Sequence, residues 1–124
     1  MRGTRYDLED RLVDFAVRIC TLTDRFPSTA LAEHVATQMM RSGTSPLANY
    51  GEAQGAESRQ DFVHKLKVCL KELRETQAWL KFVDRMRFCP EHIVAAREEC
   101  NELVSILVSS VRTAQGKVKM SNIQ

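Results

Sequence analysis

Apolar residues recur in this chain at alternating steps of four and three, in four separate stretches. That spacing puts the apolar side chains on one face of an α-helix, so each stretch predicts one helix. The stretches cover residues 8–26, 31–49, 62–83 and 93–114. Glycine and proline, at five and three residues of 124, are too scarce for the many turns of a β architecture. Long helices are therefore the main elements that this chain can form.

The four predicted helices form one domain. Helices of roughly 20–25 residues span about 30–37 Å, and the short connections between them make neighbours antiparallel. A chain of 124 residues has the usual size of a single domain and buries enough surface to fold without a staple. We predict an all-α fold, an antiparallel up-down-up-down four-helix bundle over residues 1–124, with a flexible tail at about 117–124.

The residue types between the four apolar stretches predict where the helices begin and end. Ser28 or Thr29 is expected to cap the second helix, and Ser58 the third, because hydroxyl groups accept hydrogen bonds from free backbone N–H groups. Pro90 suits the first position of the fourth helix, where no N–H is needed. Gly116 is expected to end that helix.

The second helix contains Pro46 in a segment of small residues that begins at Ser42. Proline lacks an N–H and its ring crowds the carbonyl four residues earlier, which costs about 3 kcal/mol in an unbroken helix. Either the helix kinks here or two shorter helices meet. We expect a kink near Pro46, since apolar and small residues keep the same phase on both sides. Small residues would also let a neighbouring helix come close.

Some apolar residues lie off the core stripes of their helices. A broad core stripe, common in globular helices, is one explanation. It does not account for apolar residues on opposite sides of one helix, and large exposed apolar patches usually mark an interface. We therefore predict self-association through the following residues: Val13, Val17, Cys20, Trp79, Phe82, Ile106 and Val108.

The polar face of the third helix carries cations at the same alternating steps. They are Lys67, Lys71, Arg74, Lys81 and Arg85. Cations along an elongated surface neutralise successive phosphates and release counterions, so we predict contact with RNA or DNA here, with Arg41 as a further candidate. A solvated face is the alternative, because Lys and Arg fill such faces in many proteins and Glu72 and Glu75 lie on the flank. The net charge of +2 does not decide between the two.

No catalytic residue, metal site or cofactor is predicted, so we expect the protein not to be an enzyme. His34, His64 and His92 fall in three different helices with no nucleophile motif beside them. Cys89 and His92 would be half of a metal site whose other ligands are missing nearby, and we expect the four cysteines to be free thiols. No apolar run approaches the ~18 residues that span a bilayer, and the first residues lack the apolar core of a signal peptide. We expect no membrane contact and a cytoplasmic location.

A motif lies between Gln38 and Thr76. Its residues are Gln38, Arg41, Ser45, Ala48, Asn49, Glu52, Ser58, Phe62, Leu66, Leu70, Lys71, Glu72, Leu73 and Glu75. They match, in order, the pattern Q-L-R-R-A-A-x-S-I-x-A-N-I-A-E-G, a serine-rich turn, F-x-x-x-L and an S-L-x-E-L-like stretch. The chain thereby resembles the bacterial four-helix-bundle proteins named for intervening sequences of large-subunit ribosomal RNA genes. Departures from the pattern include Met40, Pro46 and the pair Tyr50-Gly51.

The resemblance implies a cytosolic four-helix bundle that assembles as a ring-like homopentamer. The family is also similar to the accessory variability determinant of diversity-generating retroelements, a basic pentameric barrel that binds nucleic acid and reverse transcriptase. The family name states where the genes lie and does not show that the products bind ribosomes. Two functions stay open: a non-catalytic homopentamer that binds structured RNA or other nucleic acid, and a protein-interaction or structural assembly module that binds none.

Overall fold

Four long α-helices make up almost all of the described chain. The computed structural model describes residues 7–123, with side chains described up to Gly116. The helices are α1 (Leu8–Thr23), α2 (Ala30–Gln54), α3 (Arg59–Met86) and α4 (Ile93–Ile123), and residues 7–123 contain no β-strand. The prediction of an all-α fold is confirmed.

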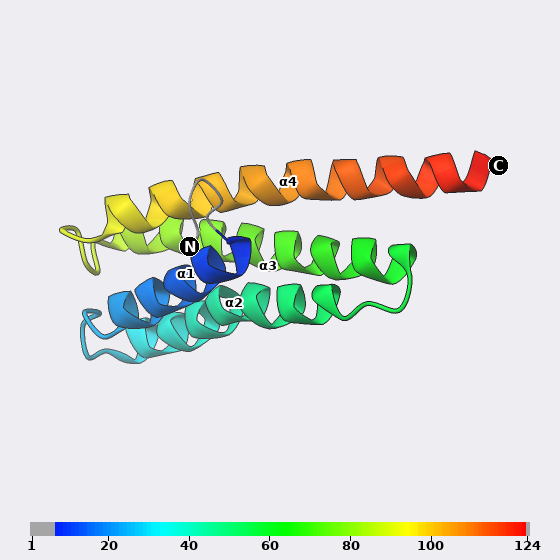
Figure 1. Cartoon of the computed structure of the whole chain (residues 1–124). Helices are drawn as coiled ribbons and strands as arrows, with labels where there is room; N and C mark the ends of the chain where they lie inside the picture. Colours follow the sequence, from blue (N-terminus) through cyan, green and yellow to red (C-terminus); the bar gives the residue numbers. More distant parts are fainter. Residues whose placement is uncertain (1–6, 124) are drawn as a thin grey trace.

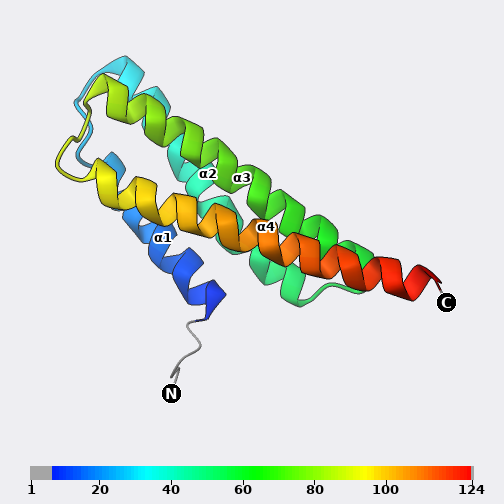
Figure 2. The same cartoon turned by 90° about the horizontal axis from the view of Figure 1, so that it is seen from above.

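The helices lie side by side, and each runs back along the one before it (Figure 1). α2 packs extensively against α1 and α3, and α3 against α4, whereas α1 makes few contacts with α4. α1 is also the shortest helix, at 16 residues against 31 for α4. The connections at residues 24–29 and 87–92 lie at one end of the bundle, which we call the loop end. α1 covers that end, and α4 extends well beyond α1 at the other (Figure 2).

Three helices begin with a side-chain cap. Thr29 Oγ1 accepts a hydrogen bond from the N–H of Ala32 at 3.1 Å, and Ser58 Oγ accepts one from the N–H three residues later at 3.0 Å. These bonds satisfy first-turn N–H groups that have no partner within the helix. The predicted caps Thr29 and Ser58 are therefore confirmed. Asp7, which the sequence analysis did not identify, caps α1 by accepting a hydrogen bond from the N–H of Glu9 at 3.1 Å.

Two predicted helix limits are wrong. Pro90 lies in the turn before α4, whose first residue is Ile93. Gly116 lies inside α4, which continues to Ile123. The backbone at Gly116 is not left-handed, as a glycine C-cap requires, and one interior glycine costs a helix only about 1 kcal/mol. Residues 117–123 of the predicted tail therefore continue the helix, while their side chains and residue 124 lie outside the described part of the chain.

α2 is one continuous helix through Pro46, so the alternative of two shorter helices is wrong. Pro46 is buried, and its carbonyl accepts a hydrogen bond from Cys69 Sγ of α3 at 3.4 Å. Contacts with the neighbouring helices thus stabilise a segment that is a poor helix former on its own. The kink at Pro46 stays a prediction.

The small residues before Pro46 let two neighbouring helices approach α2 closely. A Cβ added to Gly43 would lie 2.8 Å from Ile19 Cγ2 of α1, closer than real Cβ contacts allow. The hydroxyl oxygens of Ser42 and Thr76 of α3, both buried, are hydrogen bonded at 2.7 Å. This close approach agrees with the expectation for small residues.

The core lies between the helices and takes side chains from all four. Leu12 and Phe15 of α1, Met39 of α2, Leu73 of α3 and Leu103 of α4 are each at most 1% exposed. These positions belong to the apolar stripes with steps of four and three. None of the described helices has an apolar stretch long enough to cross a lipid bilayer.

Candidate nucleic-acid interface

The outward face of α3 carries the predicted cations. Five exposed cations share it: Lys67, Lys71, Arg74, Lys81 and Arg85. The core residues Leu66, Leu73 and Leu80 lie on a different face, since each directly precedes one of these cations and is turned about 100° from it around the helix axis. From Lys67 to Arg85 the stripe covers about 27 Å, at 1.5 Å per residue. We call these five residues the basic stripe.

Three acidic residues of α3 face its neighbours. Asp84 Oδ2 accepts a hydrogen bond from Arg97 of α4 at 2.6 Å. Glu72 Oε1 accepts one from Arg41 of α2 at 3.0 Å, and Glu75 also pairs with Arg41. Within residues 7–116, no cation of the basic stripe forms an ion pair. The charges of the stripe are therefore available to a ligand from solvent.

Arg41 is placed differently from the basic stripe. Its side chain is 50% exposed and joins α2 to α3 through Glu72, whose side chain is only 11% exposed, and through Glu75. The pKa of Glu75 is lowered, chiefly by the hydrogen bond from Arg41, and further by the hydrogen bond from Trp79 and by the charges of Arg41 and Lys71. The charge of Arg41 is thus balanced by two carboxylates, and phosphate contact by Arg41 stays a prediction.

The predicted interface residues of α1 and α4 do not form one surface. Val13 and Val17 are 37% and 59% exposed on α1, with half-buried Cys20 near them on the helix. Ile106 and Val108 of α4 are half-buried and pack against the core. These two are about 200° apart around the helix axis, so they face different neighbours. The packing of Ile106 and Val108 agrees with a broad core contact, and an oligomer interface at these two residues stays a prediction.

Several apolar residues that the sequence analysis did not assign to an interface are exposed. Leu31, which the spacing placed on a core stripe, is 46% exposed because it lies in the first turn of α2, at the loop end. Met40, Met86 and Val94 are 38%, 43% and 61% exposed. The helical period of the sequence alone does not show that these side chains are exposed, because their exposure depends on where a neighbouring helix ends.

Aromatic side chains from two helices and two connections meet at the loop end. Ring centroids are 6.4 Å apart for His34 and Trp79, 6.0 Å for Trp79 and Phe82, 6.5 Å for Phe82 and Phe88, and 5.3 Å for Phe88 and Phe26. We call these five residues the aromatic row. Phe82, at its middle, is 37% exposed. Trp79 and Phe82 are predicted interface residues, whereas the spacing of apolar residues does not indicate the other three, which are distant in sequence.

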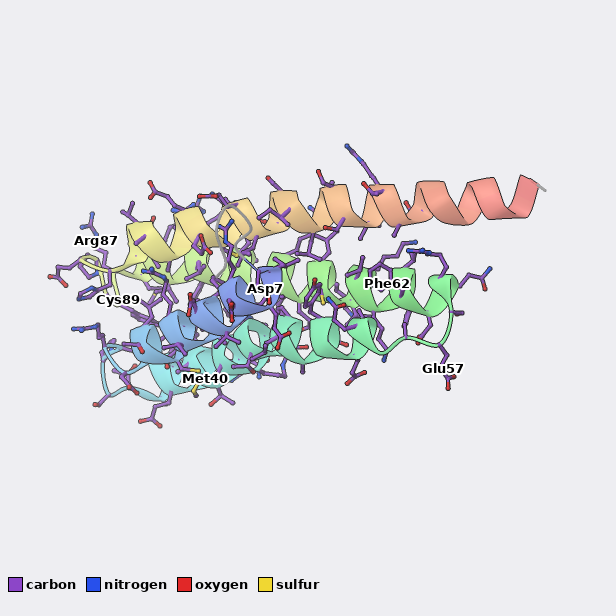
Figure 3. The ribbon with its side chains drawn as sticks, in the orientation of Figure 1. Asp7, Met40, Glu57, Phe62, Arg87 and Cys89 are labelled. Carbon is purple, nitrogen blue, oxygen red and sulfur yellow. The ribbon has the colours of Figure 1, made fainter. Side chains whose placement is uncertain are left out.

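Arg87 ends α3 in a backbone conformation that favours glycine. Its φ and ψ of 58° and 41° are left-handed, and it is the one non-glycine residue with positive φ in the described part of the chain. A side chain in this region costs roughly 1–2 kcal/mol. Arg87 is exposed at the loop end (Figure 3), and it directly precedes Phe88 of the aromatic row in the sequence.

The described residues contain no group of three or more His, Cys, Asp or Glu that could hold a metal ion. Burial raises the pKa of the Cys89 thiol, whereas His92 is exposed. Burial also raises the pKa of Cys69 and Cys100 to about 12. All four cysteines are free, and the three buried ones are protonated near neutral pH, which makes them unreactive.

The chain has relatives of the same fold. Residues 6–109 match the family described as 23S rRNA-intervening sequence protein. The chain is also similar to a protein of unknown function from the S23 ribosomal protein family of Bacteroides thetaiotaomicron, known from a crystal structure. The two share 34% sequence identity with a TM-score of 0.74, over 85% of this chain and 98% of the other. No match was found among curated proteins.

Proposed function

The chain belongs to the 23S rRNA-intervening sequence protein family, and we propose that it is a non-catalytic, cytoplasmic homo-oligomer that binds nucleic acid through the basic stripe. One observation carries the proposal. The five cations of the stripe are exposed on one side of α3, while Glu72, Glu75 and Asp84 of the same helix pair with neighbouring helices. The result is an elongated positive surface on a chain whose net charge is only +2.

Such a surface suits a phosphate backbone. Duplex DNA carries one negative charge per about 1.7 Å of its axis, so a stripe of about 27 Å lies along more phosphates than it has cations. Contacts with phosphate are independent of sequence. With about five phosphates neutralised, affinity should fall about 500-fold for a duplex and about 130-fold for a single strand when salt rises from about 50 to about 200 mM.

Self-association would strengthen this surface, since several copies of the stripe add their fields. Exposed apolar side chains on two helices support assembly: Val17 of α1 is 59% exposed and Val94 of α4 is 61% exposed. The family resemblance supports five copies. Sedimentation at micromolar concentration tests the assembly, and a monomer of 14.1 kDa would refute it.

The binding proposal is tested by fluorescence anisotropy with a labelled RNA hairpin and a DNA duplex. Wild-type protein should bind both at about 50 mM salt and release them as salt rises. The double variant Lys71→Glu/Arg74→Glu replaces two cations of the stripe with anions and should lose binding. Both side chains are exposed, so its helical circular dichroism should match that of the wild type.

A matched control distinguishes the effect of the stripe on binding from the effect of net charge. The variant Arg18→Glu/Arg59→Glu changes net charge by the same amount at two exposed residues outside the stripe. It should retain most of the binding. An equal loss in both variants would show that the stripe has no special role, and a wild type that binds neither probe would refute nucleic-acid binding.

A second candidate is a protein-interaction or structural assembly module without nucleic-acid binding. The exposed apolar residues favour it, since Val17 and Val94 are more exposed than side chains that only fill a core. Oligomerisation without binding of either probe is the result that supports this function.

A further inference from the structure

The aromatic row adjoins one end of the basic stripe. Phe82 stands on α3 directly after Lys81 and one turn before Arg85, and more than a third of its surface is exposed. We propose that the ligand of the basic stripe is single-stranded nucleic acid, whose unpaired bases stack on Phe82. This inference rests on the proposed function, because the stripe supplies the phosphate contacts.

The neighbours of Phe82 hold its ring in place. Trp79 and Phe88 contact it from two sides in edge-to-face geometry, with interplanar angles of 87° and 81°. Trp79 is fixed in turn, since its Nε1 donates a hydrogen bond to Glu75 Oε2 at 3.2 Å, and Arg41 binds the same carboxylate. A fixed, partly exposed ring loses little freedom when a base stacks on it.

Aromatic side chains beside a positive surface are the arrangement by which proteins bind single strands without sequence preference. A base in a duplex is already stacked between its neighbours, so the ring cannot reach its face. The stripe would bind either form of nucleic acid through phosphate, whereas Phe82 would add contacts only with unpaired bases. The expected ligand is therefore a single strand.

Three exposed cations lie close in sequence to Phe82 and Phe88 of the row. Lys81 and Arg85 flank Phe82 on α3, and Arg87 follows in the left-handed position where glycine is usual. An arginine that keeps a strained backbone at this point is consistent with a role for its side chain, since such conformations cluster at binding sites. Met86 and Leu31, also exposed, would suit an apolar protein partner, but the cations favour a polyanion.

The experiment compares a labelled oligouridine with an RNA duplex of equal length at about 50 mM salt, where phosphate contacts are strong. Wild-type protein should bind the oligouridine more tightly than the duplex. Phe82→Ala should weaken oligouridine binding about tenfold, the effect of losing one base–aromatic stack, and leave duplex binding unchanged. Phe82→Leu keeps an apolar side chain without a ring face and should behave in the same way, which covers the case that the alanine variant folds poorly.

Two further measurements separate stacking from other contacts. Met86→Ala removes an exposed apolar side chain one turn from Phe82 and should leave both affinities unchanged. Trp79, the only tryptophan, lies 6.0 Å from Phe82, so its fluorescence should change on addition of oligouridine and not of duplex.

The outcomes distinguish this inference from the proposed function. Three results would overturn the stacking inference and leave the proposed role of the basic stripe intact. The wild type could bind oligouridine and duplex with equal affinity, or the Phe82 variants could lose affinity for both probes equally. Met86→Ala could also lose as much affinity for oligouridine as the Phe82 variants. Failure of the wild type to bind either probe would refute the proposed function itself.

Discussion

Replacement of Gly43 by alanine tests the close approach of α1 and α2. The new Cβ would lie 2.8 Å from Cγ2, 3.1 Å from Cβ and 3.2 Å from Cγ1 of Ile19, a fully buried side chain. Because the Cβ of Ile19 is itself too near, a change of rotamer cannot relieve the contact, and the backbones must move apart. Overpacking of this kind costs about 1–3 kcal/mol, which the higher helix propensity of alanine offsets by about 1 kcal/mol.

Gly51 provides the matched control, since it lies on the same helix and a Cβ there would have no neighbour within 4 Å. Gly51→Ala should raise the free energy of unfolding by up to about 1 kcal/mol through propensity alone. The difference between the two alanine variants cancels propensity and leaves the clash, about 1–3 kcal/mol.

Urea unfolding, followed by circular dichroism at one fixed protein concentration, measures both values. The double variant Gly43→Ala/Ile19→Leu, which removes Cγ2 of Ile19, should recover part of the loss. If the two alanine variants are equally stable, α1 and α2 are not packed as closely as described.

Three further predictions concern ionisation and the backbone. The pKa of Glu75 is lowered chiefly by the hydrogen bond from Arg41. The Glu75 carboxylate therefore stabilises the fold fully at pH values above 4.5, its usual pKa, and this stabilisation is lost as pH falls through the lower pKa of the folded protein. The loss of stability in Glu75→Gln, about 0.5–1 kcal/mol at neutral pH, should therefore vanish at strongly acidic pH in urea titrations. Mass spectrometry after alkylation of folded protein should show one modified thiol, Cys20, because the other three are buried and their pKa values are raised; modification of Cys69 or Cys100 would contradict their burial. Arg87→Gly should raise the free energy of unfolding by about 0.5–1 kcal/mol, since glycine adopts left-handed φ without a Cβ penalty; a lower value in urea titrations would show that the arginine side chain stabilises the fold.

The helices and two of their caps were predictable from sequence because the information lies within one or two turns. Residues of the four apolar stripes, such as Leu73 and Leu103, are buried where a neighbouring helix covers the stripe. Thr29 and Ser58 act on N–H groups only three residues away. Local geometry alone determines these features.

Other features depend on how the helices are aligned with one another. Arg41 donates a hydrogen bond to Glu72, 31 residues later in the sequence, and no local pattern predicts that contact. The aromatic row joins Phe26 and Phe88 from two separate connections. Pro46 disfavours a helix locally, yet α2 continues through it because α1 and α3 pack against the same segment.

The modest net charge of the chain conceals a separation of charge that only the tertiary structure produces. On α3, Glu72 and Glu75 face Arg41 of α2, and Asp84 faces Arg97 of α4. Each pair joins two helices, so these carboxylates lie at helix–helix contacts, and the five cations of the basic stripe face solvent. The same pairing that joins α3 to its neighbours therefore leaves the cations of the basic stripe without an ion pair among residues 7–116. An exposed helix with its acidic and basic residues intermixed would have the same composition and no comparable field along one side.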